Sequence, residues 1–461
     1  MRPSDHDHLR PTRRPGHPAG RPLLPALLIL LSTVPLAATV ARGEGLALVG
    51  GRLIDGFGGE PLENSVVLIE GERIAAVGQV GQLAVPEGWE VVSTEGMSVL
   101  PGLWEMHAHL MLVGHSDYDH WDSTYPDRFG SVIMPAAAEQ LLRAGVTSAR
   151  DLGAPLAESI QVRDAINAGE LPGPTMYVSG PFLQKEPYPG TEAFRWGVDG
   201  PEDARAKVRR LADAGVDLIK MIDQDQMTMD EVRAIVDEAH ARGLQVIGHS
   251  HRPEEIRRGI EVGVDCFEHT GLGTMPEYPA DVFELMKSRA DKLFWTPTLT
   301  PLYLYEYTRD NPERIDDPRW RRGLPDEIAE DVRRSLDHLE RLDYYQLIPK
   351  RRPTLKRKFE QLRESGVVLL IGTDSGVPLT FHSDSTWREM DLWVREHGMD
   401  PMAVIQAATY WPAVAQRVID DFGTVSEGKY ADVIAVRGDV LREINLLQDV
   451  DLVVKKGRRI R

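Results

Sequence analysis

The chain has 461 residues, of which 53 are Lys or Arg and 71 are Asp or Glu, so its formal net charge is −18. Such an acidic surface repels phosphate backbones and acidic headgroups, which argues against a protein that binds nucleic acid or anionic membranes. Apolar residues make up 42% and charged residues 27%, a globular composition that excludes a wholly disordered chain. The single cysteine, Cys266, excludes an internal disulfide, so the fold depends on its core or on bound metal.

The first 41 residues have the composition of a secretory signal. Residues 1–22 contain five arginines, an apolar run covers 23–38, and small residues follow it. The run is shorter than the ~20 residues that span a bilayer, and Pro25 and Pro35 interrupt it. We therefore predict a signal peptide over 1–41, export to the periplasm or the medium, and no stable membrane insertion after the signal is removed.

Both ends of the remaining chain are rich in short β-type runs separated by glycine turns. Alternating apolar residues with Gly, Pro and Asn between the runs are typical of hairpins. The runs cover 46–49, 51–54, 66–69, 74–78 and 90–93 near one end, and 423–425, 432–436, 451–454 and 457–460 near the other. Because two similar ends flank a different middle, we predict one small β-sandwich domain assembled from residues 45–100 and 421–461.

The middle of the chain, residues 101–420, alternates short apolar runs with amphipathic helical stretches. Eight strand–helix units of this kind predict an α/β fold, a (β/α)8 TIM barrel. The predicted strands cover 103–109, 147–151, 175–178, 217–221, 245–249, 266–269, 293–298 and 367–373. Two longer segments, 110–134 and 308–350, follow strand ends, where barrel enzymes build their sites.

Polar residues of a particular kind end five of the eight predicted strands. They are His107 and His109 on the first strand, Lys220 on the fourth, His249 on the fifth, His269 on the sixth and Asp374 on the eighth. Residues two apart on a strand face the same side, so both imidazoles of the first strand point into the barrel mouth. Each residue alone has an ordinary structural explanation, but charged groups at one buried rim are costly unless they are paired or bind metal.

The chemistry of these side chains predicts a centre with two divalent cations, with zinc as the default. Such metals take neutral imidazole and carboxylate ligands, and four histidines with one aspartate hold two cations if an anion bridges them. A neutral Lys220 amine supplies that anion by adding carbon dioxide to form a carbamate. Two cations that share a water lower its pKa towards ~7 and provide hydroxide. Asp374 is then the expected catalytic acid and base.

Two motifs make the chain similar to a known family. Pro101-Gly102 with His107 and His109 opens the barrel segment, and residues 423–433, Gly-Thr-Val-Ser-Glu-Gly-Lys-Tyr-Ala-Asp-Val, close it. In these motifs the chain resembles the amidohydrolase superfamily, in its prolidase-like and imidazolonepropionase-like branch. The resemblance implies that His107, His109 and Asp374 hold the more buried metal. It implies that His249 and His269 hold the more exposed metal and that carboxylated Lys220 bridges the two. Many such proteins form homo-oligomers.

The substrate-binding residues are harder to predict. His251 matches a second histidine that often follows the fifth-strand ligand in this branch, where it is a candidate substrate contact. Tyr188, in the segment after the third strand, and His382, after Asp374, are further candidates. Arg195 and Arg388 are candidates for binding a substrate carboxylate, although a surface ion pair is the commoner role of an arginine.

The predicted function is an exported binuclear amidohydrolase that uses a metal-activated hydroxide on the amide C–N bond of a small molecule. An N-acyl amino acid, a dipeptide or a cyclic amide would suit it. A lactonase or a phosphotriester hydrolase would use the same metal centre and stays an alternative. A mononuclear deaminase is less favoured, because such enzymes place a glutamate three residues after the fifth-strand histidine, where this chain has Arg252. A non-catalytic binding protein is disfavoured because no expected ligand is missing.

Overall fold

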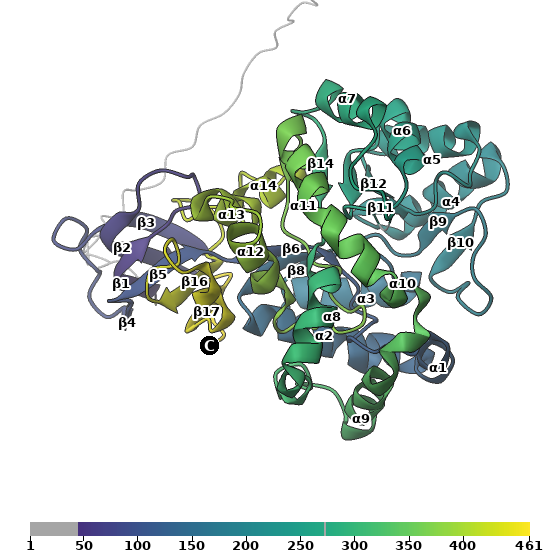
Figure 1. The fold of residues 1–461 in the computed structure, drawn as a ribbon. Helices are drawn as coiled ribbons and strands as arrows, with labels where there is room; N and C mark the ends of the chain where they lie inside the picture. Colours follow the sequence, from purple (N-terminus) through teal and green to yellow (C-terminus); the bar gives the residue numbers. More distant parts are fainter. Residues whose placement is uncertain (1–44, 272) are drawn as a thin grey trace, which may run out of the picture. The chain divides into compact units, whose positions relative to one another are not determined.

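Strands from both ends of the chain form one eight-stranded sheet. The computed structural model describes residues 45–271 and 273–461, so the predicted signal peptide, 1–41, lies outside the described residues. The sheet order is β18-β17-β16-β5-β1-β2-β3, and β4 pairs with β1 (Figure 1). Its strands are β1 Gly45–Leu53, β2 Leu62–Glu70, β3 Arg73–Gln79, β4 Glu90–Ser93, β5 Met97–Pro101, β16 Val433–Arg437, β17 Leu452–Lys455 and β18 Arg458–Arg459.

Alternating apolar residues give this sheet its cores. On β2, Val67 and Ile69 join one buried cluster, while Val66 and Leu68 join a second. The sequence predicted two strands at 46–49 and 51–54, but the structure has the single strand β1, with register shifts around Gly51. A Cβ at Gly51 would lie 2.6 Å from Val99 Cγ2, which explains a residue without a side chain there.

The strand predicted at 423–425 is absent from the described sheets. The backbone N–H of Val425 donates instead to the carbonyl of Asp55 (2.9 Å). This hydrogen bond connects the two ends of the chain outside any strand. A single hydrogen bond of this kind cannot make a ladder, so the segment is an ordered loop.

The middle of the chain contributes two parallel sheets. One has three strands, in the order β6-β7-β8, and the other has seven, in the order β10-β9-β11-β12-β13-β14-β15. Their strands are β6 Leu103–Ala108, β7 Val146–Asp151, β8 Thr175–Val178, β9 Phe182–Gln184, β10 Arg195–Gly197, β11 Leu218–Met221, β12 Gln245–His249, β13 Cys266–Glu268, β14 Phe294–Thr296 and β15 Val368–Leu369. Eight of these match the eight predicted strands, and β9 and β10 form an unpredicted ribbon after β8.

Backbone hydrogen bonds connect both edges of the three-stranded sheet to the seven-stranded one. At the β8 edge the N–H of Asp217, which directly precedes β11, donates to the carbonyl of Val178 (2.9 Å). At the other edge the N–H of Met106 donates to the carbonyl of Ile371 (3.1 Å), and the N–H of His109 donates to the carbonyl of Ser375 (2.8 Å). Consequently the ends of β6 and β15 lie next to each other although their residues are far apart in the sequence.

Helices follow most of the parallel strands (Figure 1). They are α1 Tyr118–Thr124, α2 Met134–Arg143, α3 Leu156–Asn167, α4 Pro201–Ala214, α5 Met229–Ala241, α6 Pro253–Val262, α7 Ala280–Ser288, α8 Thr300–Asp310, α9 Asp326–Ser335, α10 Asp343–Gln346, α11 Ile348–Ser365, α12 Ser385–Arg395, α13 Pro401–Ala407 and α14 Tyr410–Ala415. Short helical turns cover Pro126–Arg128, Phe129–Ile133, Pro312–Asp316, Leu336–Arg341 and Ile444–Gln448.

Local sequence explains where these helices begin and end. Thr228 and Glu231 form a capping box at the start of α5, which satisfies backbone N–H groups that have no partner within the helix. Gly215 ends α4 in the left-handed conformation, with φ of 87°. The predicted insert at 308–350 contains α9 and α10, and α11 continues from it towards β15.

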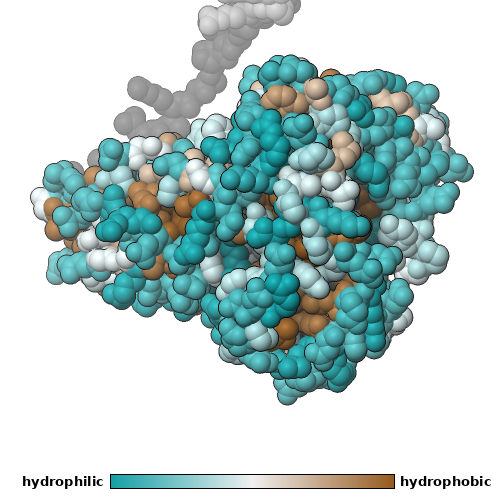
Figure 2. Space-filling view, viewed as in Figure 1, coloured by the Kyte–Doolittle hydropathy of each residue, from teal (hydrophilic) through white to brown (hydrophobic). Residues whose placement is uncertain are grey.

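The interior is closely filled and the outer surface is mainly polar. Trp104, Trp121 and Trp295 are among the largest fully buried side chains, and burying a side chain of this class stabilises the fold by about 1.5–3 kcal/mol or more. On the face seen in Figure 2, hydrophobic residues show mainly in recesses between hydrophilic ones. Among the described residues, no helix combines the length and the apolar character that a membrane crossing requires.

Candidate active site

The first two predicted ligands lie at the end of β6. His107 is the fifth residue of β6 and His109 follows the strand, and both side chains are buried. Their Nε2 atoms lie 3.3 Å apart. Asp374, which follows β15, brings Oδ1 to 3.0 Å from Nε2 of His109 and to 3.4 Å from Nε2 of His107. These three side chains therefore point at a common position.

Asp374 holds an unusual backbone conformation, with φ of 58°. A positive φ at a residue other than glycine is uncommon and is often found at functional sites. Burial alone would raise the pKa of the Asp374 carboxyl, but the nearby His107 and His109 lower it below its ordinary value. Asp374 is therefore an ionised carboxylate near neutral pH.

Three histidines from β12 and the end of β13 form a second group. The ring centroids of His249, His251 and His269 lie 4.5–4.6 Å from one another. His269 also belongs with His107 and Asp374 to a group whose ligating atoms all lie within 4.8 Å. The two groups share His269, so they adjoin. Burial lowers the pKa of His249, His251 and His269 well below its usual value, which keeps these imidazoles neutral.

Packing fixes the position of His269. Its φ is 74°, and its backbone N–H donates to the carbonyl of Thr296 (2.8 Å). Its own carbonyl accepts hydrogen bonds from Nε1 of Trp295 (2.6 Å) and from the hydroxyl of Ser250 (2.8 Å). Its Nδ1 lies 2.7 Å from Oγ1 of Thr298, which leaves Nε2 for another partner.

Lys220 lies on β11 and is fully buried. Its Nζ has no hydrogen-bond partner among the described residues. Burial lowers the pKa of this amine to about 8, so a substantial fraction is neutral under mildly alkaline conditions. A buried ammonium without a partner is costly, whereas a neutral amine has the lone pair that addition to carbon dioxide requires.

The site contains polar atoms that the described protein leaves without hydrogen-bond partners, although buried polar groups are nearly always satisfied. These atoms are Lys220 Nζ, His249 Nδ1, His251 Nδ1, His269 Nε2 and Asp374 Oδ1. Imidazole nitrogens and a carboxylate oxygen are the donors that zinc and similar divalent metals prefer. The residues present therefore fit a metal centre.

A cavity of about 630 Å³ opens over these residues. Its walls include His109, His249, His251, His269 and Asp374. A smaller cavity of about 210 Å³ adjoins it and shares His251, His269 and Asp374. Small-molecule sites are concave and have few convergent polar groups, as this one has.

Comparison with known proteins gives the family. Residues 98–460 match the model of the amidohydrolase family. The chain belongs to the amidohydrolase family. Membership confirms the predicted superfamily and the prediction of a hydrolase that acts on carbon–nitrogen bonds.

Individual amidohydrolases resemble the chain over nearly its whole length. It is 26% identical to the ochratoxinase of Aspergillus niger over 481 aligned positions, which cover 94% of this chain and 88% of the relative. A solved Xaa-Pro dipeptidase with bound methionine in the active site is 25% identical, with a TM-score of 0.70, covering 91% of this chain and 100% of that one. The solved A. niger ochratoxinase has a TM-score of 0.67 at 24% identity, covering 91% and 96%. These similarities confirm a TIM-barrel-like α/β fold.

Within this amidohydrolase the three candidate substrate residues have different positions. His251 lies beside His249 and His269 and lines both cavities. Tyr188 lines the larger cavity and is 57% exposed. His382 is buried and does not line either cavity, because its Nδ1 lies 3.0 Å from Oγ of Ser375 and its Nε2 lies 2.8 Å from the carbonyl of Leu112.

Two buried glutamates of this amidohydrolase hold the candidate ligands and were not predicted. Oε2 of Glu268 lies 2.7 Å from Nδ1 of His107, so the Nδ1–H donates to the carboxylate and the Nε2 lone pair faces the site. Glu105 accepts hydrogen bonds from the backbone N–H of His107 (3.1 Å) and of Thr373 (2.8 Å). The sequence did contain a signal for these two glutamates, because Glu105 shares a strand face with His107 and Glu268 directly precedes His269.

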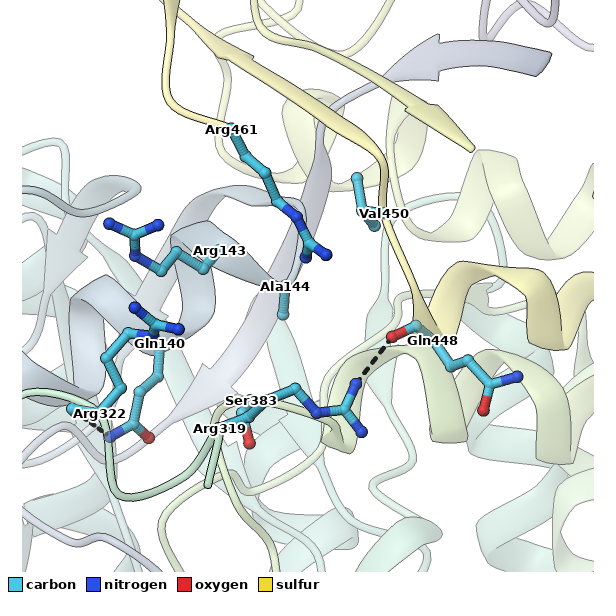
Figure 3. A pocket seen from close by; sticks show the side chains of 9 residues that line it. All are labelled: Gln140, Arg143, Ala144, Arg319, Arg322, Ser383, Gln448, Val450 and Arg461. Carbon is cyan, nitrogen blue, oxygen red and sulfur yellow. Dashed lines mark hydrogen bonds between the residues drawn. The ribbon is translucent and has the colours of Figure 1, made fainter. Parts of the chain in front are cut away.

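Another hollow of about 250 Å³ contains no ligating histidine or carboxylate among its lining residues. Figure 3 shows its four arginines, Arg143, Arg319, Arg322 and Arg461. Arg143 donates to Glu139 (2.6 Å) and Arg319 donates to Asp317 (2.8 Å), so acidic neighbours partly neutralise this positive charge. The hollow has no features of a catalytic site.

Proposed function

We propose that the chain is an exported, binuclear metal-dependent amidohydrolase that hydrolyses an amide C–N bond. The observation that carries this proposal is the pair of adjoining ligand groups that share His269, with their unsatisfied buried atoms. In this proposal His107, His109 and Asp374 hold one cation and His249 and His269 hold the other. Zinc is the proposed metal, since imidazole and carboxylate donors suit it.

Lys220 is proposed to bridge the two cations as a carbamate. Its neutral amine adds to the carbon of carbon dioxide and loses one proton to solvent, so a neutral amine becomes a carbamate anion with two oxygens. Its complete burial and the absence of a hydrogen-bond partner among the described residues support this role. A bridging anion also removes the repulsion that an ammonium would exert on two cations.

Cations held by these residues would lower the pKa of a water and polarise the scissile carbonyl. In this proposal Asp374 accepts a proton from the attacking water and delivers it to the leaving nitrogen. The neighbouring imidazoles keep the pKa of Asp374 below its ordinary value despite burial. The carboxylate is therefore deprotonated and can accept a proton. His251 borders both cavities and is proposed to contact the substrate rather than a metal.

The organisation predicted for the chain is proposed alongside this function. A closed eight-stranded barrel over 101–420 is supported by the hydrogen bonds that join both edges of the parallel sheets. A composite β-sandwich domain of 45–100 and 421–461 is supported by the sheet that unites strands of both ends. Export through a signal peptide over 1–41 is proposed on its composition alone.

Metal analysis combined with variants of Lys220 tests the proposed function. The purified protein should contain about two divalent metal ions per chain, and a chelator should abolish its hydrolysis of amides. Lys220→Ala should lose metal and at least about 100-fold of the activity. As a control, Lys429→Ala removes a buried lysine whose Nζ donates to the carbonyl of Phe422 (3.0 Å), and it should keep both the metal and the activity. A metal-free wild-type protein, or a fully active Lys220→Ala variant, would overturn the proposal.

A further inference from the structure

An arginine without an acidic partner stands in the wall of the larger cavity. Arg195 begins β10 and lines this cavity together with the candidate ligands. Its Nη1 donates to Oε1 of Gln184 (3.0 Å), while its Nε is buried and has no hydrogen-bond partner in the described part of the chain. No carboxylate of the described residues lies within 4.0 Å of its guanidinium.

Aromatic rings hold this guanidinium in place. Its Cζ lies 4.7 Å from the ring centroid of Tyr188, 5.1 Å from that of Phe182 and 5.7 Å from that of Phe194. The ring of Phe182 in turn packs against His109, with 5.8 Å between centroids. Aromatic faces attract a cation and displace water from it. The ring of Phe182 therefore contacts both a positioned positive charge and a candidate metal ligand.

Two acids lie near Arg195 but form no ion pair with it. Asp223 is engaged by Arg252, with 2.7 Å between Oδ1 and Nη2. Asp122 lies on the cavity wall, but its Oδ1 has no hydrogen-bond partner among the described residues, and burial raises the pKa of this carboxyl to about 6. An acid held in an ion pair would have a lowered pKa instead. Arg195 thus has acids nearby but no ion pair with a described residue, so its guanidinium can bind a ligand carboxylate directly.

The smaller cavity that adjoins the candidate ligands is mainly apolar. The smaller cavity shares His251, His269 and Asp374 with the larger one, and Pro301, Leu302 and Ile348 line it. Apart from Asp374, none of its lining residues is acidic, so an ammonium group placed there would have no partner of its own. The candidate ligands thus border a larger cavity whose wall contains Arg195 and a smaller, mainly apolar one.

We propose that Arg195 binds the free carboxylate of the substrate and that the substrate is an N-acyl amino acid whose acyl group enters the apolar cavity. This inference rests on the proposed function. In such a molecule only the amide nitrogen and Cα separate the scissile carbonyl carbon from the carboxylate, so both groups can lie in the one cavity that Arg195 and His109 line. A guanidinium binds a carboxylate through parallel hydrogen bonds. A dipeptide is disfavoured because its ammonium group would enter the apolar cavity.

The test compares substrates with free and blocked carboxylates on the metal-loaded enzyme. Wild type should hydrolyse N-hexanoyl-L-leucine and N-hexanoyl-L-phenylalanine better than their methylamides and better than alanyl-leucine. Arg195→Gln should raise KM for the free acids on the order of 10- to 100-fold, the value of a charge-assisted hydrogen-bonded pair, with a smaller change in kcat. Hydrolysis of the methylamides should not change. Arg195→Lys keeps the charge but cannot form two parallel hydrogen bonds. Its KM for the free acids should therefore lie between those of wild type and Arg195→Gln.

A control variant and a binding measurement make the outcomes distinct. Arg210→Gln removes an exposed arginine that stacks on Trp196 of the same ribbon at 4.4 Å, and it should behave as wild type. Equal hydrolysis of free acids and methylamides by wild type, or an equal loss of both in Arg195→Gln, would overturn the role of Arg195 and leave the amidohydrolase proposal intact.

If no amide is hydrolysed by metal-loaded protein, the proposed function fails by itself. Arg195 is then tested by calorimetric binding of N-benzyl-L-leucine, which has an amine in place of the amide. Binding should weaken at least about tenfold in Arg195→Gln and on methyl esterification of the ligand. Unchanged binding in the variant would overturn the inference.

Discussion

Glu268 orients His107, which the sequence predicts to be a metal ligand. Its carboxylate holds Nδ1 of His107 at 2.7 Å and accepts a hydrogen bond from Oγ1 of Thr296 (3.3 Å). Carboxylates behind ligating histidines fix the tautomer and raise ligand basicity. Burial raises the pKa of Glu268 to about 7, so its negative charge is easily lost.

Replacing this carboxylate should weaken metal binding more than folding. Glu268→Gln keeps the shape of the side chain but removes the charge, and we expect metal affinity to fall about 10- to 100-fold. Competition with a chelator of known affinity measures it. The matched control is Glu389→Gln, since Glu389 is also buried but accepts from the backbone of Leu299 and Thr300. Equal metal affinities in the two variants would contradict this role of Glu268.

His115 should make stability depend on pH. It is fully buried and stacks on Trp121 at 4.0 Å between ring centroids, and burial lowers its pKa from 6.5 to about 3. Between these values the unfolded chain binds a proton that the folded chain does not. Stability is therefore lost as the pH falls below about 6.5, by at most about 1.4 kcal/mol per pH unit from this group.

The variant His115→Phe keeps a ring on Trp121 and cannot take a proton. We expect its free energy of unfolding to fall less than that of wild type between about pH 6.5 and pH 4.5, as measured by urea unfolding at each pH. An identical pH dependence in both proteins would show that His115 is already protonated in the folded state or is not buried.

At the scale of elements, periodic segments were predicted well and short ones were not. The strands β8 and β12 match their predicted ranges, because their apolar periodicity is a local signal. The ribbon of β9 and β10 was missed, because strands of three residues carry no periodicity and their pairing is set by distant partners such as Met221 on β11. This ribbon carries Arg195, so the substrate side of the site was the least predictable.

The contrast between local sequence signals and contacts with distant partners also explains which site residues could be predicted. The metal ligands predicted at His107, His109, Lys220, His249, His269 and Asp374 could be proposed because the ends of parallel strands meet at one edge, and their role stays a prediction. His382 was placed by sequence distance alone, and its two hydrogen bonds hold it away from both cavities. Sequence proximity to a ligand does not specify which way a loop directs its side chain.

At the scale of the molecule, the described residues 45–271 and 273–461 form one compact unit, and contacts link its two parts. Nζ of Lys455, on β17, donates to Oγ1 of Thr175 on β8 (2.6 Å) and to Oδ2 of Asp432 (2.5 Å). The backbone N–H of Gly102 also donates to the carbonyl of Asp432 (2.9 Å). The composite sheet and the parallel strands thus share hydrogen bonds at buried positions.

These links predict cooperative unfolding. Calorimetry of the wild type should give one transition, and Lys455→Met should lower its midpoint without splitting it, because a buried Asp432 then loses its charged partner. Lys456→Met, at the neighbouring position, should change the midpoint much less. Two separate transitions in either protein would show that the composite sheet and the parallel strands unfold independently.

The pairing of β5 with β16 has a consequence for how the protein is made. Val433 on β16 lies opposite Pro101 on β5, with more than three hundred residues between them. A ribosome adds roughly 5–20 residues per second, so β1 to β5 wait on the order of tens of seconds for their final neighbours. During that time their open edge can pair with other chains. The parts of this protein that are synthesised first are thus among the last to be completed, and they are where chaperones should matter most.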